Sequence, residues 1–165
     1  MSTPPNPPLT MEAWVAFLGA HARVVPQVDK DLKSAFGISL TWFDVLYQLS
    51  LIPERRLRMQ ELADALLLSK SGLTRLVDRI EKEGLVARQV VPGDRRSLYV
   101  ALTPAGKDLV EKARPFVRGS VEMHFTSGLT DEELTVLRDA LARVGRAGAE
   151  AGAGQNENGR RPNGG

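Results

Sequence analysis

Residues 68–106 read LSKSGLTRLVDRIEKEGLVARQVVPGDRRSLYVALTPAG, and their pattern decides the fold of the chain. Ser69 is a favourable helix N-cap and Gly84 a favourable C-terminal stop, so a helix is predicted between them. Within that helix, apolar residues recur at intervals of three and four, which is the spacing of a single buried face. These apolar residues are Leu73, Leu76, Val77 and Ile80.

Two short hydrophobic runs follow this helix and predict a pair of strands, Val86–Val91 and Leu98–Leu102. The six-residue connection Pro92–Ser97 contains a Pro-Gly-Asp sequence, which supplies all the chemistry that a hairpin turn requires. Arg95 and Arg96 stand directly after it. A turn alone does not need two adjacent arginines, so they require a functional explanation.

The rest of the chain is predicted to be helical, apart from a short extended segment at Leu57–Met59. The helix over about 60–66, a three-residue turn and the helix after Ser69 have the spacing of a helix-turn-helix. Pro26 is expected to kink or break the first helix. The fold class is therefore mainly α with a small β-hairpin, a winged helix-turn-helix with added helices. The other helices are expected at about 10–34, 39–52, 104–125 (bent near Pro115) and 130–144.

Composition fits one globular domain, because 42% of the 165 residues are hydrophobic and 25% are charged. The Pro-rich start (1–9) and the Gly-rich end (148–165) lack apolar periodicity and are predicted to be disordered, leaving a single domain at 10–147. The absence of cysteine excludes disulfides and zinc–thiolate sites. No apolar run has the length of a membrane span and no signal peptide is recognisable, so a cytoplasmic location is expected.

Charge is distributed unevenly, although the net charge is only +2. Residues 55–100 hold ten basic and six acidic side chains, a local excess of four positive charges. From charge alone a solvated surface is the favoured explanation of this excess, so the placement of the charges has to decide.

A helix-turn-helix followed by a β-hairpin suits DNA, because the second helix fills the major groove while the hairpin tip reaches the adjacent minor groove. Arginine is favoured in a narrow minor groove, where the negative potential is enhanced. Asp94 is short enough to brace one of the arginines at the tip. Since the apolar stripe of the second helix must face the core, the opposite face is turned outward. The predicted DNA-binding residues are Lys70, Ser71, Thr74, Arg75, Asp94, Arg95 and Arg96.

The same stretch resembles the recognition helix and wing of MarR-type (multiple antibiotic resistance) transcriptional regulators. Their wing pattern is Asp-x-Arg followed by a strand that ends in Leu-Thr-x-x-Gly. The resemblance extends over roughly residues 10–145, since the flanking helices also follow the family's order. The matching positions in this sequence are Asp94, Arg96, Leu102, Thr103 and Gly106.

The resemblance implies a homodimer whose dimerisation helices, 10–35 and 104–147, carry a winged-helix DNA-binding lobe at 38–103. It also implies a pseudo-palindromic operator on double-stranded DNA, repression as the commoner mode, and release of the DNA by a small, aromatic, anionic ligand. The cysteine-free chain excludes the peroxide-sensing thiol mechanism of some members.

Four residues have the chemistry to hold a phenolic or aromatic acid between the dimerisation helices and the DNA-binding lobe. Tryptophan and histidine offer stacking and a hydrogen bond, and a nearby cation would offset the carboxylate. The alternative is that these side chains simply pack the core or the dimer interface. The four residues are Trp14, His21, Arg23 and Trp42.

Two other classes of function compete with that of a DNA-binding regulator. An enzyme is not expected, because the sequence has no phosphate-binding loop, dinucleotide fingerprint or metal-ligand spacing, and neither a metal nor a cofactor is predicted. A winged helix that binds DNA without sequence specificity, or that binds other proteins, remains an alternative. Such a protein would carry a strongly basic surface without base-reading side chains.

Overall fold

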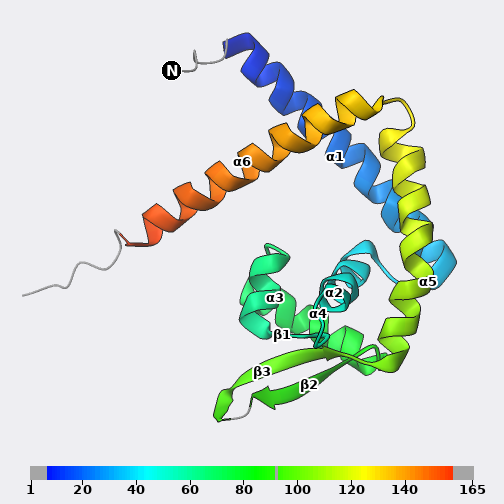
Figure 1. Cartoon of the computed structure of the whole chain (residues 1–165), viewed down its shortest axis with the longest axis vertical. Coiled ribbons are helices and arrows are strands. Elements are labelled where there is room, and N and C mark those ends of the chain that lie inside the picture. Colours follow the sequence, from blue (N-terminus) through cyan, green and yellow to red (C-terminus); the bar gives the residue numbers. More distant parts are fainter. Residues whose placement is uncertain (1–6, 92, 158–165) are drawn as a thin grey trace, which may run out of the picture. The chain divides into compact units, whose positions relative to one another are not determined.

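The computed structural model describes the backbone of residues 7–91 and 93–157, and the side chains of these residues except 95, 96 and 146–157. It divides into two compact units, one up to Phe125 and one from Thr126 onwards. The first unit contains most of the elements (Figure 1). They are α1 (Pro7–Phe36), α2 (Leu40–Leu51), β1 (Arg56–Arg58), α3 (Met59–Ala65), α4 (Lys70–Lys82), β2 (Val86–Val91), β3 (Asp94–Leu102), α5 (Pro104–Val121) and most of the π-helix η1 (Glu122–Thr126).

The predicted fold class, mainly helical with a small hairpin, is confirmed. The three strands form one antiparallel sheet in the order β1-β3-β2, so the strand before α3 closes one edge of the hairpin. Leu57 pairs with Val100 and Arg58 pairs with Tyr99 across β1 and β3. Because successive side chains in a strand point to opposite faces, Leu57 and Val100 lie on the core side and Arg58 and Tyr99 on the outer side.

The helix α4 forms as its sequence predicts. The Ser69 hydroxyl accepts a hydrogen bond from the Gly72 N–H at 3.1 Å, which caps the first turn. Gly84 follows the last turn with a φ of 71°, a conformation that glycine adopts without strain. The predicted apolar stripe is buried and joins one core with α2, α3, α5 and the sheet. The buried stripe residues are Leu73, Leu76, Val77 and Ile80.

The α2 helix presents one face to the same core. Its N-cap is Ser39, whose hydroxyl accepts from the Trp42 N–H at 3.2 Å. The last turn ends before Pro53. The inward residues Phe43, Val45, Leu46 and Leu49 are all buried.

The long helix α1 continues through Pro26, so the expectation of a break there is wrong. Pro26 lies at an exposed position, where water can hydrogen-bond the Ala22 carbonyl that loses its N–H partner. The helix begins at Pro7, earlier than the predicted boundary at residue 10. Residues 1–6 of the predicted N-terminal tail lie outside the described residues.

The α5 helix also continues through its proline, Pro115, and then changes to the π-helix η1 at Glu122. Asp31 on α1 joins this end of α5, because its Oδ2 accepts from the Ser120 hydroxyl at 2.7 Å and lies 2.8 Å from Nε2 of His124. The hydrogen bond from Ser120, which has the larger effect, and the contact with His124 hold the pKa of the Asp31 carboxyl below its usual range. The carboxylate therefore ties α1 to the C-terminal end of α5.

The second unit contains α6 (Asp131–Glu157), which begins with a capping box. The Thr130 N–H donates to Glu133 Oε2 at 2.8 Å, and the Glu133 N–H donates to the Thr130 hydroxyl at 3.3 Å. The helix continues to Glu157, beyond the predicted end near Val144. Residues 158–165 of the predicted C-terminal tail lie outside the described residues.

The wing differs from its prediction in where the second strand begins. The β3 strand starts at Asp94 rather than Leu98, so only two residues separate it from β2. Val90 pairs with Leu98, but the next residue, Val91, pairs with Asp94. The segment 95–97, which includes both arginines, therefore forms an irregularity within the strand and not a free loop. Gly93, with a φ of 81°, permits the tight turn.

Gly106, the last position of the wing pattern, allows α5 to approach the start of β2 closely. A Cβ atom at this position would lie 2.0 Å from the carbonyl oxygen of Leu85. Thr103, which caps α5, contacts the same segment: its N–H donates to Leu85 O at 3.2 Å and its hydroxyl to Gly84 O at 2.7 Å. A glycine at position 106 is therefore required by the packing of α5 against the lobe.

We expect Gly106→Ala to lower the free energy of unfolding by about 2–3 kcal/mol, because the methyl group must displace backbone. The matched control is Gly119→Ala in the same helix, where a Cβ atom would meet nothing within 4 Å. That variant should be more stable by about 0.5–1 kcal/mol, since alanine is the better helix former. Urea denaturation followed by circular dichroism measures both. Equal effects of the two substitutions would contradict the packing argument.

Candidate DNA-binding surface

The exposed face of α4 carries the four residues that were predicted to point outward from it, and their exposure is confirmed. Thr74 donates its hydroxyl proton to the carbonyl of Lys70 at 2.8 Å, which leaves the oxygen lone pairs free to accept. The Ser71 hydroxyl lies 3.4 Å from that of Ser69, next to the helix N-terminus. The four exposed residues are Lys70, Ser71, Thr74 and Arg75.

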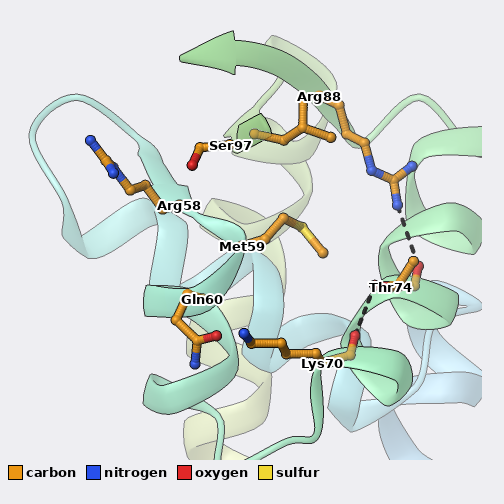
Figure 2. Close-up of a pocket in the computed structure, with 8 residues that line it drawn as sticks. Arg58, Met59, Gln60, Lys70, Thr74, Arg88 and Ser97 are labelled. Atoms are coloured by element: carbon orange, nitrogen blue, oxygen red, sulfur yellow. Dashed lines mark hydrogen bonds between the residues drawn. The ribbon is translucent and has the colours of Figure 1, made fainter. Parts of the chain in front are cut away.

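A hollow of about 400 Å³ lies between this face of α4 and the sheet (Figure 2). In Figure 2, Lys70 extends from α4 toward Gln60 at the start of α3, while Arg58 and Arg88 lie at opposite sides. No acidic residue is among the described residues that line it. The lining residues are Arg58, Met59, Gln60, Lys70, Thr74, Arg88, Ser97 and Leu98.

Arg88 on β2 is paired with two carboxylates of α4. Its Nη1 donates to Glu81 Oε2 at 2.5 Å and its Nη2 to Asp78 Oδ1 at 2.6 Å. Glu81 also accepts from the Arg88 N–H at 2.7 Å, and Arg88 Nη2 lies 3.4 Å from the Thr74 carbonyl. Only 22% of the Arg88 side chain is exposed, whereas 34% of Glu81 and 48% of Asp78 are, so the guanidinium is the sheltered member of the network. It fixes α4 against the strand β2.

Arg58 on β1 has different neighbours. Its guanidinium lies 6.0 Å from the centre of the Tyr99 ring, and that of Arg56 lies 4.8 Å from the same centre. Arg56 also donates to the Gln89 side chain at 3.4 Å. Among the described residues, neither arginine has a carboxylate within ion-pair distance. The Tyr99 ring therefore orients two arginines without cancelling their charge.

At the wing tip, Asp94 accepts a hydrogen bond from the Ser97 hydroxyl at 2.5 Å. This bond spans the irregular segment of β3 and holds its two ends together. The side chains of Arg95 and Arg96 lie outside the described residues, so the brace between Asp94 and an arginine stays a prediction. The backbone of both arginines belongs to β3.

The four predicted ligand residues lie on two helices. Trp14, His21 and Arg23 are exposed on α1, where the Trp14 ring stacks on Phe17 at a centroid distance of 6.0 Å. Trp42 lies on α2, partly buried against the hydrophobic core. Their role as a ligand site stays a prediction.

A second cavity, of about 460 Å³, lies between α2 and α5. It combines aromatic rings with cations, and the Arg114 guanidinium lies 5.8 Å from the centre of the Tyr47 ring. None of the four predicted ligand residues lines this cavity, and the sequence reasoning did not find it. Its lining residues are Phe43, Tyr47, Arg114, Pro115, Val117 and Arg118.

Sequence reasoning also missed Arg58, Gln60 and Arg88 as members of the surface around α4. The sequence indicated Arg58 and Arg88 only as two of the ten basic residues between positions 55 and 100. Their contacts depend on how distant elements pair, which the sequence alone does not reveal. The one signal in the sequence is the place of Arg88 within the strand β2, between Val86 and Val91, which are both buried. Nothing local to the sequence indicates that Tyr99 lies beneath Arg58.

Within the described part of the chain, no helix is both long enough and apolar enough to cross a membrane. The same residues contain no group of three or more His, Cys, Asp or Glu side chains placed to hold a metal ion.

Together, the sheet order, the α3–α4 pair and the hairpin beside it define a winged helix-turn-helix protein. Comparison with known proteins gives the same class. The family model described as MarR family matches residues 36–97, which cover α2 to the middle of β3. The chain is 32% identical over 149 residues to the HTH-type transcriptional regulator PecS of Dickeya dadantii (strain 3937), covering 84% of this chain and 85% of PecS.

Two crystal structures from Streptomyces coelicolor are similar along most of the chain. The MarR family transcriptional regulator AbsC has a TM-score of 0.79 and 32% identity, with 89% of this chain and 97% of AbsC covered. Sco3205, a MarR family transcriptional regulator in complex with DNA, has a TM-score of 0.80 and 26% identity, with 89% and 91% covered. The chain belongs to the MarR family of DNA-binding transcriptional regulators.

Proposed function

We propose that this protein is a homodimeric, sequence-specific repressor that binds a pseudo-palindromic operator and is released by a small aromatic anion. The observation that carries the DNA-binding part of this proposal is the exposed polar face of α4, which lies beside a hollow with no acidic side chain among its described lining residues. Residues 38–103 act as the DNA-binding lobe, and residues 10–35 and 104–147 act in dimerisation. In each protomer, α4 enters the major groove and the wing tip reaches the minor groove.

The proposed division of labour on α4 and the wing follows from residue chemistry. Arg75 can donate two parallel hydrogen bonds to the edge of a guanine. Ser71 and Thr74 can hydrogen-bond to either base of a pair. Arg96, with Asp94 close to it in sequence, suits the narrow minor groove. Lys70 and Arg95 are assigned to phosphates rather than bases in this proposal. Half-sites are expected about one helical turn apart, about 10–10.5 base pairs.

We expect Arg96→Ala to weaken operator binding by about 1–3 kcal/mol, and Arg75→Ala to relax base preference at one position in each half-site. The operator is first isolated by sequencing DNA fragments that the purified protein retains, and fluorescence anisotropy then measures affinity at physiological salt. Operator binding by Arg96→Ala equal to that of the unmodified protein would contradict the role of the wing.

The alternative function, a winged helix that coats DNA without specificity or binds another protein, is tested in the same titration. A sequence-specific regulator should prefer its operator to random DNA by about 10³-fold or more. Equal affinity for both DNAs would support the coating function, and no affinity for either would support the protein-binding one.

The proposed dimer is supported by apolar side chains that the described units leave uncovered. Isolated exposed apolar residues are ordinary, but a helix that carries many of them is typical of an association surface. In α1 the exposed fraction is 53% for Trp14, 46% for Phe17 and 43% for Leu18. Phe116, Val136 and Val144 are similarly exposed on α5 and α6.

Light scattering at micromolar concentration should therefore give about twice the monomer mass of 18.0 kDa. The apolar surface of α1 predicts that Phe17→Glu shifts this mass toward that of the monomer, because a carboxylate resists burial. The control Glu12→Gln changes charge on the same helix without adding a buried ion. A monomeric protein with full operator affinity would refute the dimer.

Release by an aromatic anion rests on the chemistry of two regions of the first unit. The predicted residues Trp14, His21, Arg23 and Trp42 supply rings and a cation. The cavity between α2 and α5 supplies the same combination and has a volume within the usual range for ligand sites. A ligand that binds the DNA-incompetent form more tightly by a few kcal/mol suffices for release.

Titration with salicylate, urate and related phenolic acids should quench tryptophan fluorescence and release the operator together. Two variants distinguish the regions: Trp14→Phe should abolish most of the quenching if the ligand lies on α1, and Arg114→Gln should abolish release if it lies in the cavity. Release without quenching would favour the cavity over the predicted residues. No release by any of these compounds at millimolar concentration would refute the ligand proposal.

A further inference from the structure

The hollow beside α4 occupies a particular place relative to the two grooves that the protein is proposed to enter. One wall is the N-terminal half of α4 with Lys70 and Thr74, and the opposite wall is the sheet with Arg88 and Ser97. A major groove and the adjacent minor groove of B-DNA are separated by one sugar-phosphate backbone. If α4 enters the first groove and the wing the second, that backbone has to pass over the hollow.

The cations around the hollow differ in whether they are available to an anion. Arg88 is paired with both Glu81 and Asp78, and these two carboxylates outweigh its charge, so Arg88 is not available. Arg58 and Lys70 have no carboxylate within ion-pair distance among the described residues. These two cations come from different elements, β1 and α4, and both line the hollow.

The hollow is also prepared for binding by contacts that fix its walls. The Tyr99 ring lies under the Arg58 guanidinium, which limits the conformations that this side chain must lose on binding. Arg88 joins α4 to β2 and so keeps the two walls at a set separation. The Gln60 amide, which donates to Asp64 Oδ1 at 2.7 Å, is likewise held in place at the rim.

We propose that the hollow is a phosphodiester-binding site, in which Arg58 and Lys70 hold the DNA strand that runs between the major and minor grooves. This inference rests on the proposed DNA-binding function and adds Arg58, together with its support Tyr99, to the residues that act in it. Arg58 contacts a phosphate and no base edge. It therefore contributes affinity on every DNA sequence and gives no preference among sequences.

The test measures the affinity of the full-length protein for operator and for random DNA of equal length, from about 50 to 200 mM salt. Arg58→Gln should weaken binding to both DNAs by about tenfold and lower the slope of log affinity against log salt by about one per protomer. Arg58→Lys, which keeps the charge, should retain the slope. Lys112→Gln on α5 is the control for loss of one exposed positive charge.

The outcomes distinguish this site from the proposed function. A protein that prefers its operator but loses neither affinity nor salt slope in Arg58→Gln, or that changes only as much as Lys112→Gln, would overturn the site and leave the function intact. A protein without operator preference would overturn specific regulation, while a lower slope in Arg58→Gln would still support the site. An altered operator preference in Arg58→Gln would overturn it, because a base contact would then be required.

Discussion

The ion pairs of Arg88 with Asp78 and Glu81 are the constraint on which the proposed DNA-binding surface depends. They cross from the strand β2 to the helix α4, which are adjacent in the chain. A recognition helix and a wing can act on one duplex only if their separation is fixed, since each must enter its own groove. Glu81 accepts from both the backbone and the side chain of Arg88, so one carboxylate sets the position of the strand as well as of the guanidinium.

The fold was predictable where local chemistry determines it. The N-caps at Ser69, Thr103 and Thr130 and the apolar stripe of α4 all lie within a few residues of the elements that they specify. The course of the chain at Pro26 and the early start of β3 were not predictable in this way. Whether a proline breaks a helix depends on what surrounds the freed carbonyl, and where a strand begins depends on the partner strand.

The candidate site was predictable to a smaller extent, for the same physical reason. The outward residues of α4 follow from helix periodicity alone once the apolar face is known. Arg58 and Tyr99 are 41 positions apart and meet only because β1 pairs with β3 in a particular register. Equally, the cancellation of the Arg88 charge depends on Glu81, a residue on another element. A count of charges along the sequence cannot separate a cation that is already paired from one that is available.

The strand β1 has a further property that follows from its place at the edge of the sheet. An edge strand exposes unpaired N–H and C=O groups, and a second chain can add to it and begin an aggregate. β1 has only three residues, and arginines stand at both of its ends. A short strand with charged ends is a poor template for such addition. Arg58, which is proposed to bind a nucleic acid, therefore also helps to keep the folded protein from assembling edge to edge.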